Sequence, residues 1–222
     1  MGYFAALLDP RIAIAEAPMS SEADGLMAGE AASVANAVAR RRLEFAMGRT
    51  CARNAIASLG HTKVALPRGE NRMPVWPADL VGSITHTDTW AAAAVARRED
   101  GFTAIGIDLE PSNELSADLW TSVCSSDEQA AVARIDGMTP GLAAHLVFCM
   151  KEAAFKCQFP ISGAMLEFAD LAIDVGADGG TFSATFRKCV APFKVDDRLM
   201  GKFAVTHDHI ASAVVISSER MP

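Results

Sequence analysis

Two acidic side chains occupy alternate positions in the segment AIGIDLEP, which we interpret as a β-strand. Because residues two apart on a strand point to the same face, Asp108 and Glu110 are expected to lie side by side, while Leu109 points into a core. Adjacent carboxylates repel each other unless a cation or a proton lies between them. Hard oxygen ligands at this spacing suit Mg²⁺, so the pattern favours a magnesium site; two solvated carboxylates at a strand end are the alternative.

A second charged group lies in the segment FCMKEAAFK, which has the composition of a helix. Glu152 and Lys156 are four residues apart and share one helix face, so they could simply form a surface ion pair. Phe148 and Phe155 are one heptad apart and are expected to pack inward. Since much of the helix is apolar, its charged edge could instead face a cleft.

Positive charge is concentrated near residues 40–53, although the chain as a whole is acidic. Arginine binds phosphate through paired hydrogen bonds, so the cluster fits a phosphate-binding patch; a solvated helix face is the alternative. His86 ends the segment GSITH beside Thr85 and Thr87, and these three side chains could together bind an anion. The basic cluster consists of Arg40, Arg41, Arg42, Arg49 and Arg53, with Arg68 and Arg72 in a later loop as its extension.

Periodicity and turn residues predict the helices that must position these residues. Residues 30–59 lack proline and are rich in good helix formers, which predicts one or two helices that stop at Gly60. Residues 116–158 return to a helical pattern, with Ser126 as a cap for one helix. The last helix is expected to close at Pro160.

Strands are predicted between and after these helices. The segments VGSITH, WAAAAVA and TAIGIDLE are joined by turns and are interpreted as an antiparallel meander. The small side chains of WAAAAVA would let a helix pack closely on that strand. Residues 171–186 and 202–216 each show the pattern strand, polar turn, strand. We therefore predict an α+β chain with two similar-sized lobes that meet near residues 103–106.

Composition limits the class of protein. The 222 residues are 50% hydrophobic and 21% charged, which excludes a disordered chain. With 20 basic and 27 acidic residues the net charge is −7, which argues against a general nucleic-acid binder. The sequence lacks a long apolar run and a secretory signal, so a cytoplasmic protein is expected. The odd number of cysteines favours free thiols, and Cys149 and Cys157 are expected to be core residues and not nucleophiles.

Five sequence blocks follow one another along residues 40–159: RRRLEFAMGRTCAR, LPRGENRMPVWP, VGSITH, AIGIDLEP and FCMKEAAFK. Together they resemble the Sfp/EntD-type 4′-phosphopantetheinyl transferases, and most closely the bacterial branch with P-x-W-P and GS-[IL]-[ST]-H blocks. GIDLE followed by KEAAFK is the diagnostic pair of that family. The sequence contains no Gly-rich nucleotide loop and no G-x-S-x-G motif, so folds with those signatures lack support.

The resemblance implies a pseudo-dimer of two similar α+β lobes, with the active site in the cleft between them. Residues 1–104 would bind the nucleotide of coenzyme A, and residues 105–222 would carry the metal-binding and catalytic acids. The enzyme would transfer the 4′-phosphopantetheine arm of coenzyme A to a serine of an apo acyl or peptidyl carrier protein. It would release adenosine 3′,5′-bisphosphate. A monomer in the cytoplasm would suffice, with neither nucleic acid nor membrane as a partner.

The resemblance also implies roles for individual residues. Mg²⁺, with Mn²⁺ as an alternative, would be held by Asp108, Glu110 and Glu152. The catalytic residues would be Glu152, Lys156 and Asp108, and Glu152 would accept the proton of the carrier serine directly or through a water. The contacts with coenzyme A would come from Arg41 (or Arg42), Arg49, Arg68, Thr85, His86, Asp108, Lys151 and Lys156.

Two other classes of protein fit the same residues less well. A metal-dependent phosphohydrolase would also use clustered carboxylates and basic residues. A coenzyme A-binding module could keep the basic site without catalysis, but the presence of all three acids and of Lys156 speaks against it. The carrier could serve fatty-acid, polyketide, siderophore or other peptide synthesis, and the resemblance to enterobactin-type enzymes favours secondary metabolism.

Overall fold

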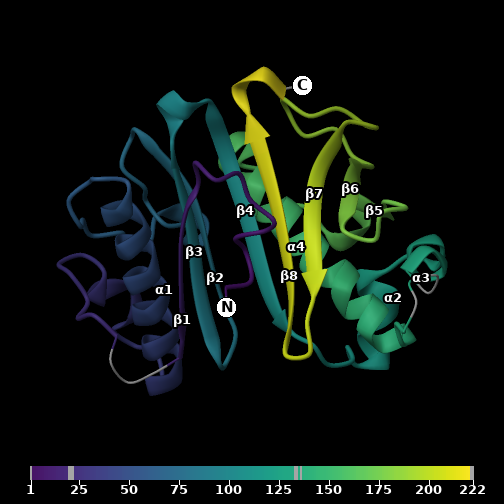
Figure 1. Cartoon of the computed structure of the whole chain (residues 1–222), viewed down its shortest axis with the longest axis horizontal. Coiled ribbons are helices and arrows are strands. Elements are labelled where there is room, and N and C mark those ends of the chain that lie inside the picture. Colours follow the sequence, from purple (N-terminus) through teal and green to yellow (C-terminus); the bar gives the residue numbers. More distant parts are fainter. Residues whose placement is uncertain (1, 20–22, 133–134, 136, 221–222) are drawn as a thin grey trace.

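Two antiparallel β-sheets lie side by side in the computed structural model, which describes residues 2–19, 23–132, 135 and 137–220 (Figure 1). The first sheet has the strand order β1-β3-β2, and the second has the order β4-β8-β7-β6-β5. The strands of the first sheet are β1 (Ala13–Pro18), β2 (Leu80–His86) and β3 (Trp90–Arg97). Those of the second are β4 (Phe102–Pro111), β5 (Leu171–Val175), β6 (Thr181–Phe186), β7 (Arg198–Val205) and β8 (His209–Ser217).

A long helix covers one face of each sheet. Helix α1 (Ala39–Ser58) packs on the first sheet, and α4 (Pro140–Ser162) packs on β4 and β8 of the second. Two short helices, α2 (Ala117–Val123) and α3 (Ser126–Val132), lie against α4. Short 3₁₀ segments cover Ala31–Val34, Glu70–Arg72, Arg98–Asp100, Phe168–Asp170 and Ser218–Arg220. The α+β prediction is confirmed, and the two sheets have three and five strands. Among the described residues, no helix is both long and apolar enough to cross a membrane.

The alanine-rich strand β3 is buried on both faces, which explains its composition. Its odd-numbered residues pack with side chains such as Cys51 and Ile56 of α1. Its even-numbered residues face a second cluster that contains Phe4 and Leu8. Because alanine protrudes little, the helix and the residues before β1 can approach the sheet from opposite sides. The predicted strand and the predicted close helix packing are both confirmed.

The predicted meander is wrong at its third strand. β2 and β3 pair with each other as expected, and β1 takes the other edge of β3. β4 pairs instead with β8, at the edge of the second sheet. The two hairpins predicted near the end of the chain are confirmed as β5–β6 and β7–β8.

Two helix boundaries also differ from the prediction. Helix α4 passes through Pro160 and ends after Ser162, where Gly163 adopts a left-handed conformation with φ 64° and donates its N–H to the carbonyl of Phe159. A proline this close to a helix end removes only one hydrogen bond, which the last turn tolerates.

Helix α3 is capped by Ser125 and not by Ser126. The Ser125 hydroxyl accepts the N–H of Glu128 at 3.2 Å, and the Glu128 carboxylate accepts the N–H of Ser125 at 2.8 Å. This reciprocal pair is a capping box, which requires the acid three residues after the cap. The cap therefore lies one residue earlier than the sequence pattern indicated.

The two sheets meet along β2 and β4, which are the edge strands that face each other (Figure 1). The Ser83 hydroxyl accepts the N–H of Ile107 at 3.1 Å, and the Thr85 hydroxyl accepts the N–H of Leu109 at 3.1 Å. The residue numbers advance together, so the two strands run parallel across this seam. Side-chain hydroxyls there take the place of the main-chain carbonyls of a continuous sheet.

Residues 2–12 cover the seam on the face opposite the two long helices (Figure 1). Phe4 is completely buried there between alanines of β3 and residues of β4 and β8. Glu16 of β1 holds this segment, because its carboxylate accepts the main-chain N–H groups of Tyr3 at 2.8 Å and of Phe4 at 3.0 Å. This segment does not cover the other face of the seam, which is the face toward the two long helices.

Candidate active site

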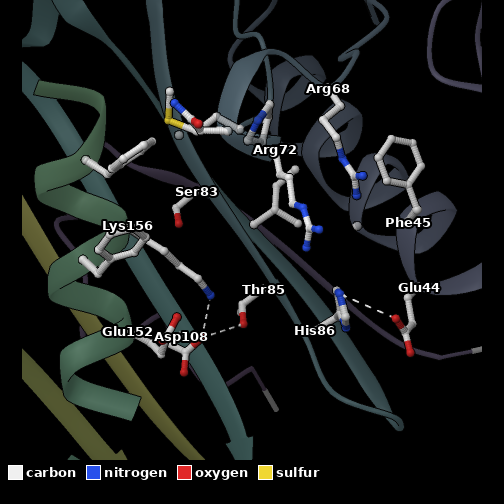
Figure 2. Close-up of a pocket in the computed structure, with 18 of the residues that line it drawn as sticks. Glu44, Phe45, Arg68, Arg72, Ser83, Thr85, His86, Asp108, Glu152 and Lys156 are labelled. Atoms are coloured by element: carbon white, nitrogen blue, oxygen red, sulfur yellow. Dashed lines mark hydrogen bonds and ion pairs between the residues drawn. The ribbon is translucent and has the colours of Figure 1, made fainter. Parts of the chain in front are cut away.

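A cavity of about 450 Å³ opens between α1, β2, β4 and α4 (Figure 2). Arginines come from α1 and from the loop that precedes β2, whereas carboxylates come from β4 and α4. The charged and polar residues around it include Arg41, Arg49, Arg68, Arg72, Thr85, His86, Asp108, Glu110, Glu152 and Lys156. The structure therefore brings together every predicted site residue except Lys151.

The acidic side of the cavity depends on a close approach of α4 to β4. Gly106 permits it, because a Cβ at that position would lie 2.0 Å from the main-chain oxygen of Ala153. Lys156 then reaches the strand, and its Nζ donates to Oδ1 of Asp108 at 2.5 Å. Burial alone would lower the pKa of Lys156, but the Asp108 carboxylate raises it above its ordinary value, so the amine stays charged. Lys156 thus takes its partner from the strand and not from Glu152 on its own helix.

The two carboxylate oxygens of Asp108 have different surroundings. Oδ1 accepts from Lys156 and also, at 3.2 Å, from the hydroxyl of Thr85 (Figure 2). Oδ2 is buried and has no hydrogen-bond partner among the described residues. A buried carboxylate oxygen without a partner is unfavourable, because it has lost its hydration. Oδ2 is therefore suited to bind a cation or a donor supplied by a ligand.

Glu110 and Glu152 line the same acidic side. Burial, and then the negative charge of Asp108, raise the pKa of Glu152, so it holds a proton more readily than an ordinary glutamate. Within the described part of the chain, no three His, Cys, Asp or Glu side chains are already grouped as a metal site. The unpartnered Oδ2 of Asp108 and the two nearby glutamates nevertheless supply the hard oxygen donors that Mg²⁺ prefers. These residues fit the ion, although they are not assembled around it.

The basic side is organised by hydrogen bonds on α1. Arg41 Nη1 donates to Oε2 of Glu44 at 2.9 Å and to Nε2 of His86 at 2.8 Å. Since a guanidinium has no acceptor, Nε2 of His86 must accept, and this imidazole is neutral with its proton on Nδ1. Burial also lowers the pKa of His86, which favours the same neutral form of the imidazole.

Two further arginines enclose the ring of Phe45. The guanidinium of Arg49 lies 4.2 Å from the ring centroid and that of Arg68 lies 5.8 Å from it. Arg49 also donates to the carbonyl of Leu66 at 2.6 Å, and burial lowers its pKa to about 10, so it remains charged at neutral pH. Nε of Arg68 is buried and has no partner among the described residues. Buried positive charge of this kind suits an anionic ligand.

The other arginines of the basic cluster have structural or surface positions. Arg40 is exposed. Arg42 donates to the carbonyls at positions 35 and 37, just before α1. Arg53 is fully buried in an ion pair with Glu30, at 2.9 Å. Arg41, and not Arg42, is therefore the residue that lines the cavity.

Lys151 does not line the cavity, so the geometry gives no support to its predicted contact with coenzyme A. Its Nζ donates to Glu128 at 2.9 Å and to the carbonyls of Val123 and Phe168, each at 2.8 Å. All three donors of the ammonium group are thus used inside the protein. Neighbouring residues on a helix differ in direction by about 100°, and Lys151 is not among the residues that line this cavity, whereas Glu152 is.

We expect Lys151→Met to destabilise the protein by about 3–5 kcal/mol, because it leaves the buried Glu128 carboxylate without its cation. Thermal and urea unfolding would measure this loss, and the exposed Lys202→Met is the matched control. The variant protein that remains folded should have a KM for its small-molecule substrate within about threefold of the wild-type value. A stable variant with a strongly raised KM would show that Lys151 reaches the ligand.

The cysteines lie outside this chemistry. Cys149 and Cys157 are buried on the face of α4 that packs on the second sheet. Burial raises the pKa of Cys157 to about 12 and that of Cys149 well above its usual value. Neither supplies a thiolate nucleophile at neutral pH.

Several residues that line the cavity were not predicted as site residues. Glu44 holds Arg41, which in turn contacts His86, and its position three residues after Arg41 was the available signal. Phe148 and Phe155 were expected to pack inward; both line the cavity, and Phe148 also packs against the core. Together with Glu152, they form a stripe along α4 at positions i, i+4 and i+7, which faces one direction.

Comparison with known proteins places both halves of the chain in one family. Residues 29–96 match the 4′-phosphopantetheinyl transferase N-terminal domain, and residues 104–207 match the 4′-phosphopantetheinyl transferase superfamily. The chain is 34% identical over 195 residues to 4′-phosphopantetheinyl transferase Svp of Streptomyces mobaraensis, covering 85% of this chain and 78% of the relative. It is 31% identical over 217 residues to 4′-phosphopantetheinyl transferase PptT of Mycobacterium tuberculosis, covering 91% and 92%. Enterobactin synthase component D of Escherichia coli is 36% identical over 137 residues, covering 61% and 63%.

Proposed function

Because the chain belongs to the 4′-phosphopantetheinyl transferase superfamily, whose members transfer the phosphopantetheine arm of coenzyme A to carrier proteins, we propose that it does so with Mg²⁺ and releases adenosine 3′,5′-bisphosphate. The observation that carries this proposal is that one cavity has a basic wall and an acidic wall. Arginines line one wall, and a buried carboxylate with an unpartnered oxygen lies in the other. Coenzyme A needs both, since its phosphates require cations and its reacting pyrophosphate requires a metal.

We assign the two walls to two lobes. The lobe formed by residues 1–104 contributes Arg41, Arg49, Arg68 and His86 and binds the adenine nucleotide and its 3′-phosphate. The lobe formed by residues 105–222 contributes the acids and Lys156. The seam between β2 and β4 supports this division, because it separates the two sheets.

The transfer step is a displacement at phosphorus. The hydroxyl oxygen of the carrier serine forms a bond to the phosphorus that bears the pantetheine arm, and the bond from that phosphorus to the oxygen of adenosine 3′,5′-bisphosphate breaks. Glu152 accepts the hydroxyl proton directly or through a water, and its raised pKa suits a base that must take up a proton. Lys156 stays charged beside Asp108 and stabilises negative charge on the phosphate.

Asp108, Glu110 and Glu152 would hold Mg²⁺, or Mn²⁺ in its place. When bound, the ion supplies positive charge to the pyrophosphate oxygens and stabilises the leaving group. The unpartnered Oδ2 of Asp108 supports this assignment, because it lacks any other donor among the described residues. The three acids also offset the positive charge that Lys156 brings into the same site.

We propose that the carrier belongs to secondary metabolism, such as polyketide or siderophore synthesis. The relative named enterobactin synthase component D supports a siderophore pathway. We further propose a cytoplasmic monomer that needs neither nucleic acid nor a membrane, since one chain already supplies both walls of the cavity.

A panel of apo carrier proteins tests the function directly. Each carrier is mixed with the protein, coenzyme A and Mg²⁺, and its mass is measured. A mass gain equal to one phosphopantetheine arm indicates transfer and identifies the preferred carrier. Cleavage of coenzyme A without a mass gain would indicate a phosphohydrolase, and binding without either would indicate a coenzyme A-binding module.

Replacing Arg41 with alanine should raise the KM for coenzyme A about ten- to a hundredfold, because one charged hydrogen bond to phosphate is lost. Arg42→Ala is the matched control, since that side chain leaves the cavity for the carbonyls before α1. Steady-state kinetics with both variants measures the difference. Equal penalties for Arg41→Ala and Arg42→Ala would remove Arg41 from the nucleotide site.

A further inference from the structure

Three hydroxyl side chains at alternate positions connect β2 and the residue after it to the second sheet. Ser83 binds the main chain of β4, and Thr85 does so two residues further along. Thr87 lies just after β2 and contacts Nε2 of His209, the first residue of β8, at 3.3 Å. Each of these contacts crosses the seam. Of the three hydroxyls, only that of Thr85 also reaches a carboxylate of the cavity.

The hydrogen bonds of Thr85 fix the direction of its single hydroxyl hydrogen. Oγ1 accepts the N–H of Leu109 at 3.1 Å, so its hydrogen is available for one acceptor only. That acceptor is Oδ1 of Asp108, at 3.2 Å. Thr85 is 3% exposed, so water does not compete freely for either bond. A hydroxyl used in this way cannot also donate to a phosphate of the substrate.

Thr85 and Lys156 both donate to Oδ1 of Asp108 and come from different elements, β2 and α4. Two donors on one oxygen restrain the carboxylate from turning (Figure 2), and they leave Oδ2 as the oxygen without a partner among the described residues. Partners behind a metal ligand commonly set its orientation and its affinity for the ion.

We infer that Thr85 is a positioning residue: it extends from the lobe that binds the nucleotide and holds Asp108 of the other lobe ready for the metal ion. This inference rests on the proposed function, because it assumes that Asp108 binds the metal. It replaces the direct contact with coenzyme A that the sequence resemblance implied for Thr85. It also gives the seam a role in the reaction, since the bond that aligns the acid crosses it.

Three variants separate this role from a purely structural one. Thr85→Val keeps the shape of the side chain but loses both hydrogen bonds, and Thr85→Ser keeps the hydroxyl. Ser83→Ala is the matched control, because it loses a seam bond of the same length, 3.1 Å, that does not involve Asp108. Thermal unfolding of all three gives the cost to the fold.

Mn²⁺ binding to the whole protein, followed by electron paramagnetic resonance without coenzyme A, is the main measurement. Thr85→Val should bind Mn²⁺ about 10- to 100-fold more weakly than wild type, as for other partners behind metal ligands. Thr85→Ser should restore binding to within about threefold. Ser83→Ala should lose stability without a change in Mn²⁺ affinity. The KM of Thr85→Val for coenzyme A, measured at saturating Mn²⁺, should match that of wild type.

Asp108→Ala distinguishes failure of this inference from failure of the metal assignment. If wild type and Asp108→Ala bind Mn²⁺ equally, Asp108 is not a metal ligand and the inference falls with that assignment. If Asp108→Ala loses Mn²⁺ while Thr85→Val binds it normally, the metal assignment holds and the positioning role of Thr85 is overturned. A raised KM for coenzyme A with normal Mn²⁺ affinity would make Thr85 a substrate contact.

Discussion

Asp108→Ala is expected to lower the rate of Mg²⁺-dependent transfer by about a hundred- to a thousandfold, the usual effect of removing one group that stabilises transition-state charge. The variant loses the buried oxygen that has no other partner, and it also frees Lys156 from its ion pair. Transfer of the phosphopantetheine arm to a carrier, measured by mass spectrometry over a series of Mg²⁺ concentrations, gives the size of the loss.

Asp174→Ala is the matched control for this experiment. Asp174 is an exposed acid on β5, so its removal changes the net charge equally but leaves the cavity intact. Circular dichroism should show that both variants are folded. If folded Asp108→Ala were as active as wild type at limiting Mg²⁺, the metal assignment would be wrong.

Glu152→Gln is expected to keep its fold and to lose about 10²- to 10⁴-fold in turnover, the usual contribution of a general base. The amide has nearly the same shape as the carboxylate but cannot take the proton of the serine hydroxyl, and it is a poorer metal ligand. Because Lys156 pairs with Asp108, the substitution should not break an ion pair on α4. Single-turnover transfer measures the chemical step without the contribution of product release.

The exposed Glu99→Gln is the control for a change of one glutamate to its amide. The KM for coenzyme A of Glu152→Gln should change much less than its turnover, because the nucleotide contacts come from the other wall. Near-normal turnover would falsify the role of Glu152 as a base.

Residue periodicity was sufficient to predict the elements that carry the site. Alternation in β4 predicted that Asp108 and Glu110 share a face while Leu109 enters a core, and Leu109 is fully buried. The strand character of the alanine-rich segment followed from the turns on either side of it, against its helical propensity. These are local properties, so a single sequence contains them.

The local sequence pattern did not determine which strands pair with each other. β4 could satisfy its alternation beside β3 or beside β8, and only packing of the whole chain decides between them. The direction of Lys151 does not follow from helix spacing, because Lys151 lies three residues after Phe148 and four before Phe155, beside the stripe on α4. Its contacts with Glu128 and two main-chain carbonyls decide it. The resemblance to a family implied a contact with coenzyme A for Lys151, as it did for its neighbours along the chain. The bond between Thr85 and Asp108 depends on the seam, which no local pattern indicates.

The seam also bears on how the protein avoids self-association. β2 and β4 are each the last strand of a sheet, and an uncovered last strand offers its main-chain groups to any other extended chain. Here each one shields the other, and the hydroxyls of Ser83 and Thr85 occupy N–H groups of β4 that a foreign strand would otherwise bind. Separating the two lobes by cutting the chain would uncover both edges at once. The contact between β2 and β4, across which Thr85 reaches Asp108, thus also shields both strand edges from a foreign strand.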